Sequence, residues 1–168
     1  MIKFFVAASI SSFLSALFGV SWDSVDAKID REYPGIEFIS TAQLYQKYQD
    51  EGAELPLVID VREADEFLIS HLADAVNLQT GESISRIVAD KNAPIVVYCS
   101  VGYRSAGVAA ELRQLGYTNV VNLRHSLFEW ANNDYPMVND AGDTDKVHPF
   151  NRVWGALVEK SRHLYWSR

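Results

Sequence analysis

Short apolar runs alternate along the chain with longer stretches in which apolar residues recur at helical spacing. The runs are rich in β-branched residues and are bounded by polar or turn-forming residues, which is typical of buried strands. The predicted strands are residues 36–39, 57–61, 75–78, 95–98 and 119–123. Because strands that alternate with helices form parallel sheets covered on both faces, the pattern predicts the α/β class, with a central, mostly parallel five-stranded sheet.

The stretches between the strands carry helix signals. Ser40 and Gln43 have the spacing of a capping box and predict a helix that continues through Tyr48. Three further helices are predicted at residues 82–88, 106–115 and 127–131. Gly116 follows the second of these stretches and is the residue type expected just beyond the end of a helix.

The chain's single cysteine, Cys99, lies between the predicted strand at 95–98 and an amphipathic stretch. In a loop that joins a strand to a helix, converging backbone N–H groups and the helix dipole together stabilise an anion. Gly102 provides the positive φ that such a loop needs, Arg104 provides a cation, and Ser105 is the expected N-cap. Because these features lower the pKa of a thiol, we expect a nucleophilic Cys99 rather than a buried structural cysteine.

A set of short motifs is spread over residues 36–138. They are Leu57-Val58-Ile59-Asp60-Val61-Arg62-Glu63 with Glu66-Phe67, Ser70-His71-Leu72 through Ala75 and Asn77-Leu78, the loop from Cys99 to Arg104, and Trp130 and Pro136. Together they resemble the rhodanese-like sulfurtransferases. The resemblance implies a rhodanese-like fold and a cysteine that takes sulfane sulfur from a donor such as thiosulfate. The cysteine then holds this sulfur as a persulfide and passes it to a thiol or cyanide.

By the same resemblance, Cys99 is the catalytic residue and its loop forms the pocket around the persulfide. The expected substrate-binding residues are Ser100, Val101, Gly102, Tyr103, Arg104 and Ser105. We expect Val101 and Tyr103 to line the mouth of this pocket. Four residues separate Cys99 from Arg104, one fewer than in cysteine phosphatases, and the shorter loop favours a persulfide sulfur over a phosphate. A noncatalytic rhodanese module that carries sulfur or binds a partner is the alternative function.

The chain departs from the family pattern at positions where glycine is usual. Ser70 and Asp74 replace glycines near the histidine motif, and His125-Ser126 replaces a glycine pair before Trp130. If that turn requires positive φ, His125 costs free energy relative to glycine. The shape of the pocket wall is therefore less predictable than the identity of the nucleophile.

The motifs before the cysteine loop contain charged or ionisable residues that are candidates for a role near it. Asp60 and Arg62 lie at the carboxyl end of a predicted strand, where ligands bind in open α/β sheets, and we expect them to support the loop near Cys99. Arg62 and Glu66 are four residues apart and have the spacing of a helical ion pair. His71 is expected to bond to the backbone rather than to act as a base.

Composition narrows the range of partners. The net charge of −7 and the pI near 5.0 argue against nucleic-acid binding, which relies on clustered basic residues. A single cysteine excludes an intramolecular disulfide, so an external thiol must discharge any persulfide on Cys99. We expect a small sulfur donor and a thiol acceptor as partners, with no metal and no cofactor; the oligomeric state is not predicted.

The two ends of the chain differ from its middle. Residues 4–20 carry no charge and follow Lys3, which predicts a signal peptide or membrane anchor over residues 1–27 and an exported (periplasmic) or membrane-anchored protein. A core helix of a cytoplasmic protein is the alternative. The predicted rhodanese-like domain spans residues 28–138. Residues 139–168 are predicted as a linker and an amphipathic helix with Phe150, Val153, Trp154, Leu157, Val158 and Leu164 on its apolar face.

Overall fold

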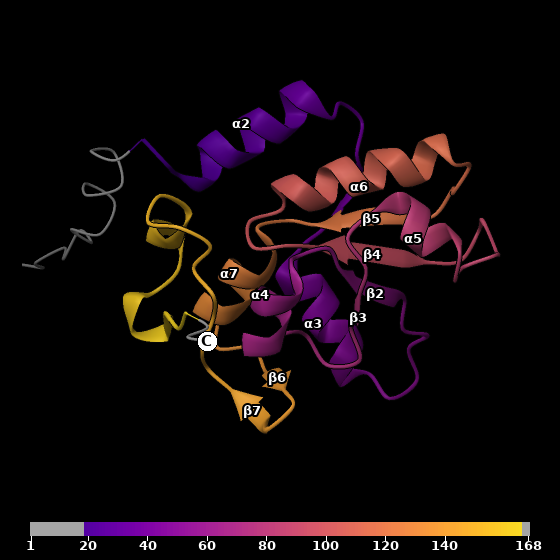
Figure 1. Ribbon diagram of the computed structural model, residues 1–168. Coiled ribbons are helices and arrows are strands. Elements are labelled where there is room, and N and C mark those ends of the chain that lie inside the picture. Colours follow the sequence, from indigo (N-terminus) through magenta and orange to yellow (C-terminus); the bar gives the residue numbers. More distant parts are fainter. Residues whose placement is uncertain (1–18, 166–168) are drawn as a thin grey trace, which may run out of the picture.

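The computed structural model describes residues 19–165 and has a parallel sheet at its centre (Figure 1). The strands are β1 (Phe38–Ile39), β2 (Leu57–Asp60), β3 (Val76–Asn77), β4 (Ile95–Tyr98) and β5 (Val120–Leu123). All five run parallel, in the order β1-β5-β4-β2-β3. The predicted fold class is confirmed. β1 and β3 are shorter than predicted, because each is an edge strand with one neighbour to pair with.

Helices cover both faces of the sheet. They are α2 (Trp22–Glu32), α3 (Thr41–Gln49), α4 (Ala64–Ile69), α5 (Gly81–Ser85), α6 (Tyr103–Gln114) and α7 (Ser126–Asn132). In Figure 1, α5 and α6 lie on one side of the sheet and α3, α4 and α7 on the other. Successive side chains of a strand point to opposite faces, so β4 gives Val96 and Tyr98 to one hydrophobic cluster and Ile95 and Val97 to the other.

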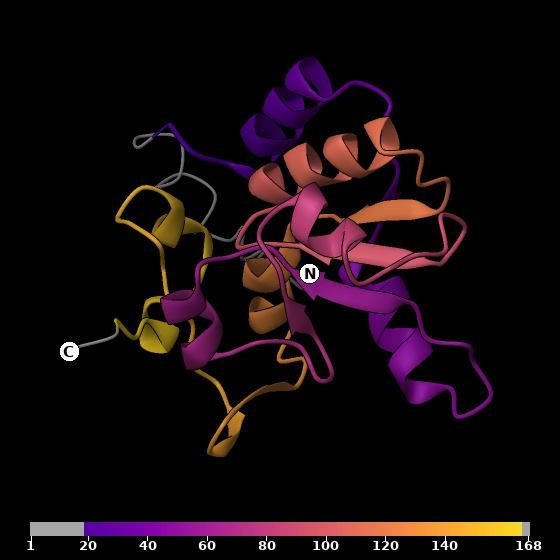
Figure 2. The same ribbon diagram turned by 45° about the vertical axis from the view of Figure 1, so that its right-hand side comes forward.

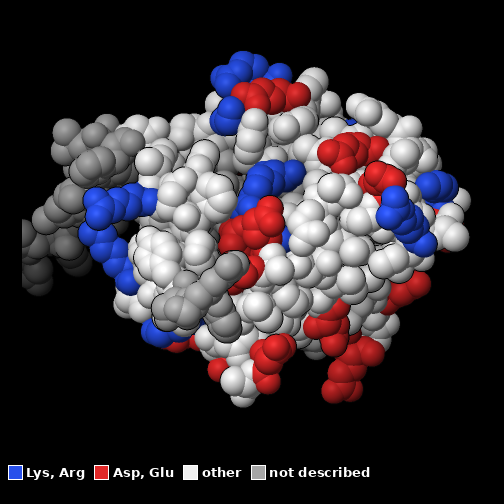
Figure 3. Space-filling view, in the orientation of Figure 1, with Lys and Arg blue, Asp and Glu red and all other residues white. Residues whose placement is uncertain are grey.

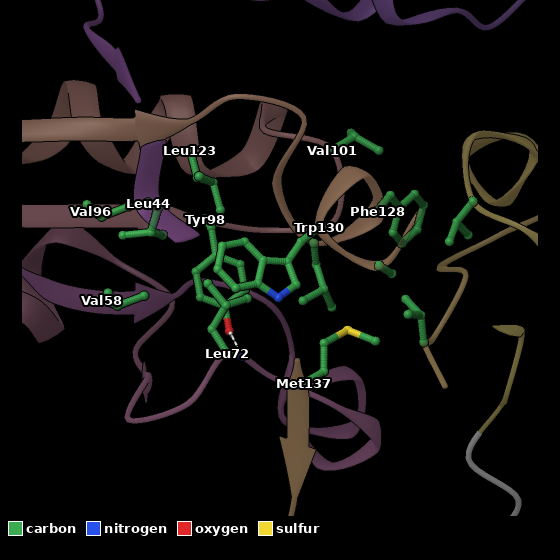
Figure 4. Packing of buried hydrophobic residues seen from close by; sticks show 14 of the residues in the cluster. Leu44, Val58, Leu72, Val96, Tyr98, Val101, Leu123, Phe128, Trp130 and Met137 are labelled. Carbon is green, nitrogen blue, oxygen red and sulfur yellow. Dashed lines mark hydrogen bonds between the residues drawn. The ribbon is translucent and has the colours of Figure 1, made fainter. Parts of the chain in front are cut away.

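Trp130 of α7 lies in the middle of the larger cluster (Figure 4). Its indole Nε1–H donates to the carbonyl of Pro136 at 2.9 Å, which pairs a polar atom that burial would otherwise leave unsatisfied. Next to it, the hydroxyl of Tyr98 accepts a hydrogen bond from the backbone N–H of Leu72 at 3.1 Å. These bonds let two large aromatic residues fill the space between the sheet and the segment around Met137.

The helix starts confirm one sequence prediction and correct another. The Ser40 hydroxyl accepts from the Gln43 N–H at 3.1 Å, and the Gln43 side chain accepts from the Ser40 N–H at 2.9 Å, so the predicted capping box is present. The prediction that Ser105 is an N-cap is wrong: α6 begins earlier, and its N-cap is Gly102, with φ of 98°. Glycine tolerates this left-handed conformation, which allows the chain to enter the helix immediately after the cysteine loop.

The C-terminal segment does not form the predicted amphipathic helix. The expected linker is partly an antiparallel hairpin of β6 (Met137–Asn139) and β7 (Gly142–Thr144). Two short 3₁₀ helices follow, η1 (Trp154–Leu157) and η2 (Lys160–Arg162). Val158 and Glu159 separate them, and Val158 is extended and buried in the larger cluster. The prediction of a helix from the apolar periodicity was wrong, because the apolar residues pack on the core from separate turns rather than from one helix.

At the other end, α2 belongs to the folded unit. Val25 and Ile29 are buried in the larger cluster, and Ser21 and Ser24 form a capping box at the start of the helix. The predicted boundary at residue 27 therefore falls inside α2. The predicted leader at residues 1–18 lies outside the described residues. Within residues 19–165, no helix has both the length and the apolar character needed to cross a bilayer.

His125 fastens α2 to the domain. It stacks on Trp22 with ring centroids 4.3 Å apart, and its two ring nitrogens lie 3.3 Å from Asp26 and 2.8 Å from Glu129. Burial lowers the pKa of His125, but the two carboxylates outweigh it and raise the pKa above its ordinary value. Its φ of 56° is left-handed, so the positive φ considered for this turn is present. The left-handed conformation costs about 1 kcal/mol for a residue with a Cβ, and the contacts of the imidazole ring offset this cost.

Replacement of His125 by glycine should have an effect on stability that depends on pH. The raised native pKa means that the imidazolium stabilises the fold below the ordinary histidine pKa, and that this contribution is lost as the pH rises through the native value. His125→Gly should therefore lower the free energy of unfolding more at about pH 5.5 than at about pH 8.5. Urea unfolding at the two pH values measures the difference.

His125→Asn is the matched control, because asparagine tolerates positive φ but carries no charge. It should show the same dependence on pH as His125→Gly. Equal losses at both pH values for the two variants would contradict the ionic role.

Candidate active site around Cys99

Cys99 directly follows β4, a central strand, at the carboxyl edge of the parallel sheet. The strand itself is completely buried, and Cys99 is only 1% exposed. The chain then turns through Ser100, Val101 and Gly102 into α6. The strand, tight loop and helix predicted around the cysteine are thus present, and they fix the thiol at the end of the strand.

The thiol lies within reach of hydrogen-bond donors from its own loop. The Gly102 N–H donates to Cys99 Sγ at 3.2 Å, and the Ser105 hydroxyl lies 3.5 Å from the same sulfur. Burial raises the pKa of the Cys99 thiol. The Arg104 charge, the Ser105 hydroxyl and the backbone N–H groups of Ser105 and Val101 lower it by more than burial raises it. The net pKa lies below the ordinary value, so the thiolate is favoured relative to a free cysteine.

The start of α7 holds the cysteine loop in place. The Ser126 hydroxyl accepts from the Cys99 N–H at 3.2 Å and donates to the Leu123 carbonyl at 2.9 Å. The N–H groups of Leu127 and Phe128 donate to the carbonyls of Cys99 and Ser100 at 3.2 and 3.0 Å. Because the loop carbonyls are bound to α7, the loop N–H groups remain directed toward the sulfur.

Asn122 of β5 was not singled out from the sequence, although it is completely buried beside the loop. Its Nδ2 donates to the Gly102 carbonyl at 2.8 Å, and its Oδ1 accepts from the Ser105 hydroxyl at 2.7 Å. Both ends of the amide are therefore satisfied, as burial requires. The available signal was an amide side chain inside the apolar run Val120–Leu123, which indicates a buried partner.

The Arg104 guanidinium points toward α4. It donates to the two Glu66 oxygens at 2.7 and 2.8 Å and to the Ser100 hydroxyl at 3.1 Å. Burial raises the pKa of Glu66, but its bonds and charge attraction to Arg104 lower it below its ordinary value. The helical Arg62–Glu66 pair considered from spacing does not form, because Glu66 bonds to Arg104 across the fold.

Asp60 and Arg62 form a separate, completely buried ion pair. The Arg62 Nη2 lies 2.6 Å from Asp60 and also donates to the Ser70 carbonyl at 2.6 Å. Its guanidinium lies 5.9 Å from the ring centre of Tyr98, the residue before the cysteine. The pair thus orders the end of β2 and adjoins the cysteine strand, and it has no described bond to Cys99. Their assignment as supporting residues stays a prediction.

Two residues expected to line the mouth are placed differently. Val101 is 5% exposed and packs in the larger cluster. The Tyr103 hydroxyl bonds to Glu32 of α2, and the Lys28 ammonium lies 4.5 Å from the Tyr103 ring centre. Both side chains therefore join parts of the fold rather than forming an open apolar mouth. His71 bonds to the Phe67 carbonyl at 3.1 Å, the backbone contact expected of it.

Comparison with known proteins places this geometry in a family. The model of the rhodanese-like domain matches residues 40–133, more than half of the chain. The chain belongs to the rhodanese-like domain family. It is 33% identical over 107 residues to a sulfurtransferase of Allochromatium vinosum, covering 62% of this chain and 96% of that protein.

Among residues 19–165, no group of three or more His, Cys, Asp or Glu side chains is arranged to hold a metal ion.

Other relatives share a smaller part of the rhodanese-like region. Thiosulfate sulfurtransferase PspE of Escherichia coli is 36% identical over 67 residues, which cover 38% of this chain and 64% of that protein. A rhodanese-related protein of Thermoplasma volcanium has 28% identity and a TM-score of 0.50, covering 61% of this chain and 97% of that one. Thiosulfate sulfurtransferase of Pseudomonas aeruginosa, at 18% identity and a TM-score of 0.57, shares the fold over 81% of this chain and 25% of its own.

Arg104→Gln should raise the pKa of the Cys99 thiol, because the Arg104 charge is the largest contribution that lowers it. The rate of Cys99 alkylation by iodoacetamide, measured against pH, should shift its midpoint to higher pH. Arg113→Gln, in the last turn of the same helix, is the matched control and should leave the profile unchanged. Identical profiles for Arg104→Gln and the wild type would contradict the electrostatic role.

A double variant separates this effect from stability. Arg104→Gln leaves Glu66, which is 4% exposed, without its cation and should lower the free energy of unfolding by about 2 kcal/mol. Glu66→Gln combined with Arg104→Gln removes the unpaired carboxylate. It should recover stability and keep the raised thiol pKa.

Proposed function

We propose that the protein is a sulfurtransferase in which Cys99 takes sulfane sulfur from a donor such as thiosulfate and passes it to a thiol or cyanide. The family and the relatives named as sulfurtransferases support sulfur transfer in general. The observation that carries the specific proposal is the buried sulfur that accepts the Gly102 N–H at 3.2 Å and whose pKa is lowered. A lowered pKa provides the nucleophilic thiolate at neutral pH.

In the first half-reaction, the Cys99 thiolate attacks the outer sulfur of thiosulfate. A sulfur–sulfur bond forms to Cys99, and the bond inside the donor breaks, so that sulfite leaves with the electron pair. In the second half-reaction, an acceptor thiolate or cyanide attacks the outer sulfur. The Cys99 thiolate then leaves with its electron pair, and neither half-reaction needs an external oxidant or reductant.

Three groups support the anionic states of this cycle. The Gly102 N–H donates to the sulfur, the Ser105 hydroxyl lies 3.5 Å from it, and the Arg104 charge lies on the first turn of α6. The Ser105 hydroxyl has one proton, which it gives to Asn122 at 2.7 Å while its distance to the sulfur is 3.5 Å. A small rotation of this hydroxyl would redirect the proton when the sulfur becomes more negative.

Incubation with thiosulfate should add the mass of one sulfur atom to the intact protein, and cyanide should remove it and release thiocyanate. Cys99→Ser is the matched control and should gain nothing. Because the chain has one cysteine, a persulfide on cysteine can only be on Cys99. No mass gain on the wild type, or an equal gain on Cys99→Ser, would contradict the proposal. A persulfide that forms but is not removed by cyanide would favour the sulfur-carrier alternative.

We further propose that the N-terminal residues export or anchor the protein, on the basis of the uncharged stretch at residues 4–20. Removal of residues 1–27 would delete Val25 from the core, so any cleavage should occur before α2, near Gly19–Ser21. N-terminal sequencing of the native protein tests this. A first residue inside α2 would contradict the position, and an intact Met1 in a soluble fraction would contradict export and anchoring.

A further inference from the structure

The C-terminal segment, residues 146–165, follows the region matched by the family model and is fastened to α7. The Asn132 side chain donates to the Leu157 carbonyl at 2.8 Å and accepts from the Glu159 N–H at 3.1 Å. Val147 is completely buried. Figures 1 and 2 show this segment, in yellow, on the side of the molecule where α4 and α7 lie. The helix that holds the cysteine loop therefore also holds the C-terminal segment.

Phe150 in this segment has an unusual conformation for an aromatic residue. Its φ is 61°, in the left-handed region, and the residue is 44% exposed. A left-handed conformation costs about 1–2 kcal/mol for a residue with a Cβ. Burial in the core does not compensate this cost, since Phe150 is not part of either hydrophobic cluster. Backbone strain that is not offset by packing is often found at functional positions.

Neighbouring residues hold Phe150 in this conformation. Its N–H donates to the His148 Nδ1 at 3.1 Å, and the Asn151 N–H donates to the Pro149 carbonyl at 2.7 Å. The Asn151 side chain then accepts from the N–H groups of Val153 and Trp154 at 2.9 and 3.0 Å. The loop is thus closed by local hydrogen bonds, and the ring is presented in one direction.

That direction is toward Arg104. The Arg104 Cζ lies 4.7 Å from the Phe150 ring centre, while the edge of the guanidinium bonds to Glu66 and Ser100. The ring therefore covers part of the group whose charge acts on the Cys99 sulfur. Near the centre of the face seen in Figure 3, basic and acidic side chains lie next to one another.

We propose that Phe150 is a specificity-determining residue, whose ring forms one wall of the mouth above Cys99 and holds back bulky acceptors while small linear ones pass. The inference rests on the proposed function for its acceptors. It agrees with the 1% exposure of Cys99, since a reagent that reaches a sulfur so covered must pass the side chains that surround it. It also assigns the role of mouth wall to a segment outside the family region, in place of Val101 and Tyr103.

The first test does not require sulfur transfer. Cys99 is alkylated with iodoacetamide and with a fluorescein-bearing iodoacetamide, and the ratio of the bulky to the small rate constant is compared among variants. Phe150→Ala should raise this ratio by about tenfold, the scale on which a small change in a pocket wall discriminates between ligands. Phe150→Tyr keeps the ring, and Val153→Ala removes an exposed side chain of the same segment; both should leave the ratio unchanged.

The second test uses the persulfide. After loading with thiosulfate, the rate constants for sulfur removal by glutathione and by cyanide are measured, and Phe150→Ala should raise the glutathione-to-cyanide ratio to a similar extent. Unchanged ratios in Phe150→Ala, or an equal rise in Val153→Ala, would overturn the role of Phe150. A wild type that does not take up sulfur would overturn the proposed function, while the alkylation ratio would still decide the role of the ring.

Discussion

The proposed activity depends on one constraint: a sulfur that is almost completely buried must be stable as an anion. Burial alone would raise the pKa of Cys99 and make it inert. The Arg104 charge, the Ser105 hydroxyl and the backbone N–H groups of Ser105 and Val101 reverse this effect, so that the pKa is lowered. The Gly102 N–H also donates to Sγ, at 3.2 Å. The left-handed Gly102 makes the arrangement possible, because it lets α6 begin only four residues after Cys99.

The replacement of two usual glycines by His125 and Ser126 is explained by what these side chains do. Both residues have left-handed φ values, 56° and 50°, so the backbone of the turn is the one that glycine would adopt. Ser126 uses its hydroxyl to fix the Cys99 N–H, and His125 binds α2 through Asp26 and Trp22. The strain is thus offset by contacts that glycine cannot make, and the turn couples the cysteine loop to the N-terminal helix.

Local signals in the sequence predicted the elements, but they could not predict contacts between distant elements. The capping box of Ser40 and the loop of Cys99 depend on neighbours within a few residues, and both were found. The Arg104–Glu66 pair joins residues 38 apart, and spacing instead suggested a local partner for Glu66. The prediction of a C-terminal helix was wrong for another reason. The helical periodicity is present in the sequence, but tertiary packing around Val158 overrides it.

The two segments that flank the family region meet the site from different sides. Ile29 of α2 lies 3.7 Å from the position that a Cβ on Gly102 would take, and the Phe150 ring lies against Arg104. One segment thus contacts the backbone whose N–H donates to the sulfur, and the other contacts the charge that lowers the pKa of the thiol. Because His125 at the N-cap of α7 and Asn132 at its end bind the two flanking segments, a change in one of them can alter the site without any change in the loop.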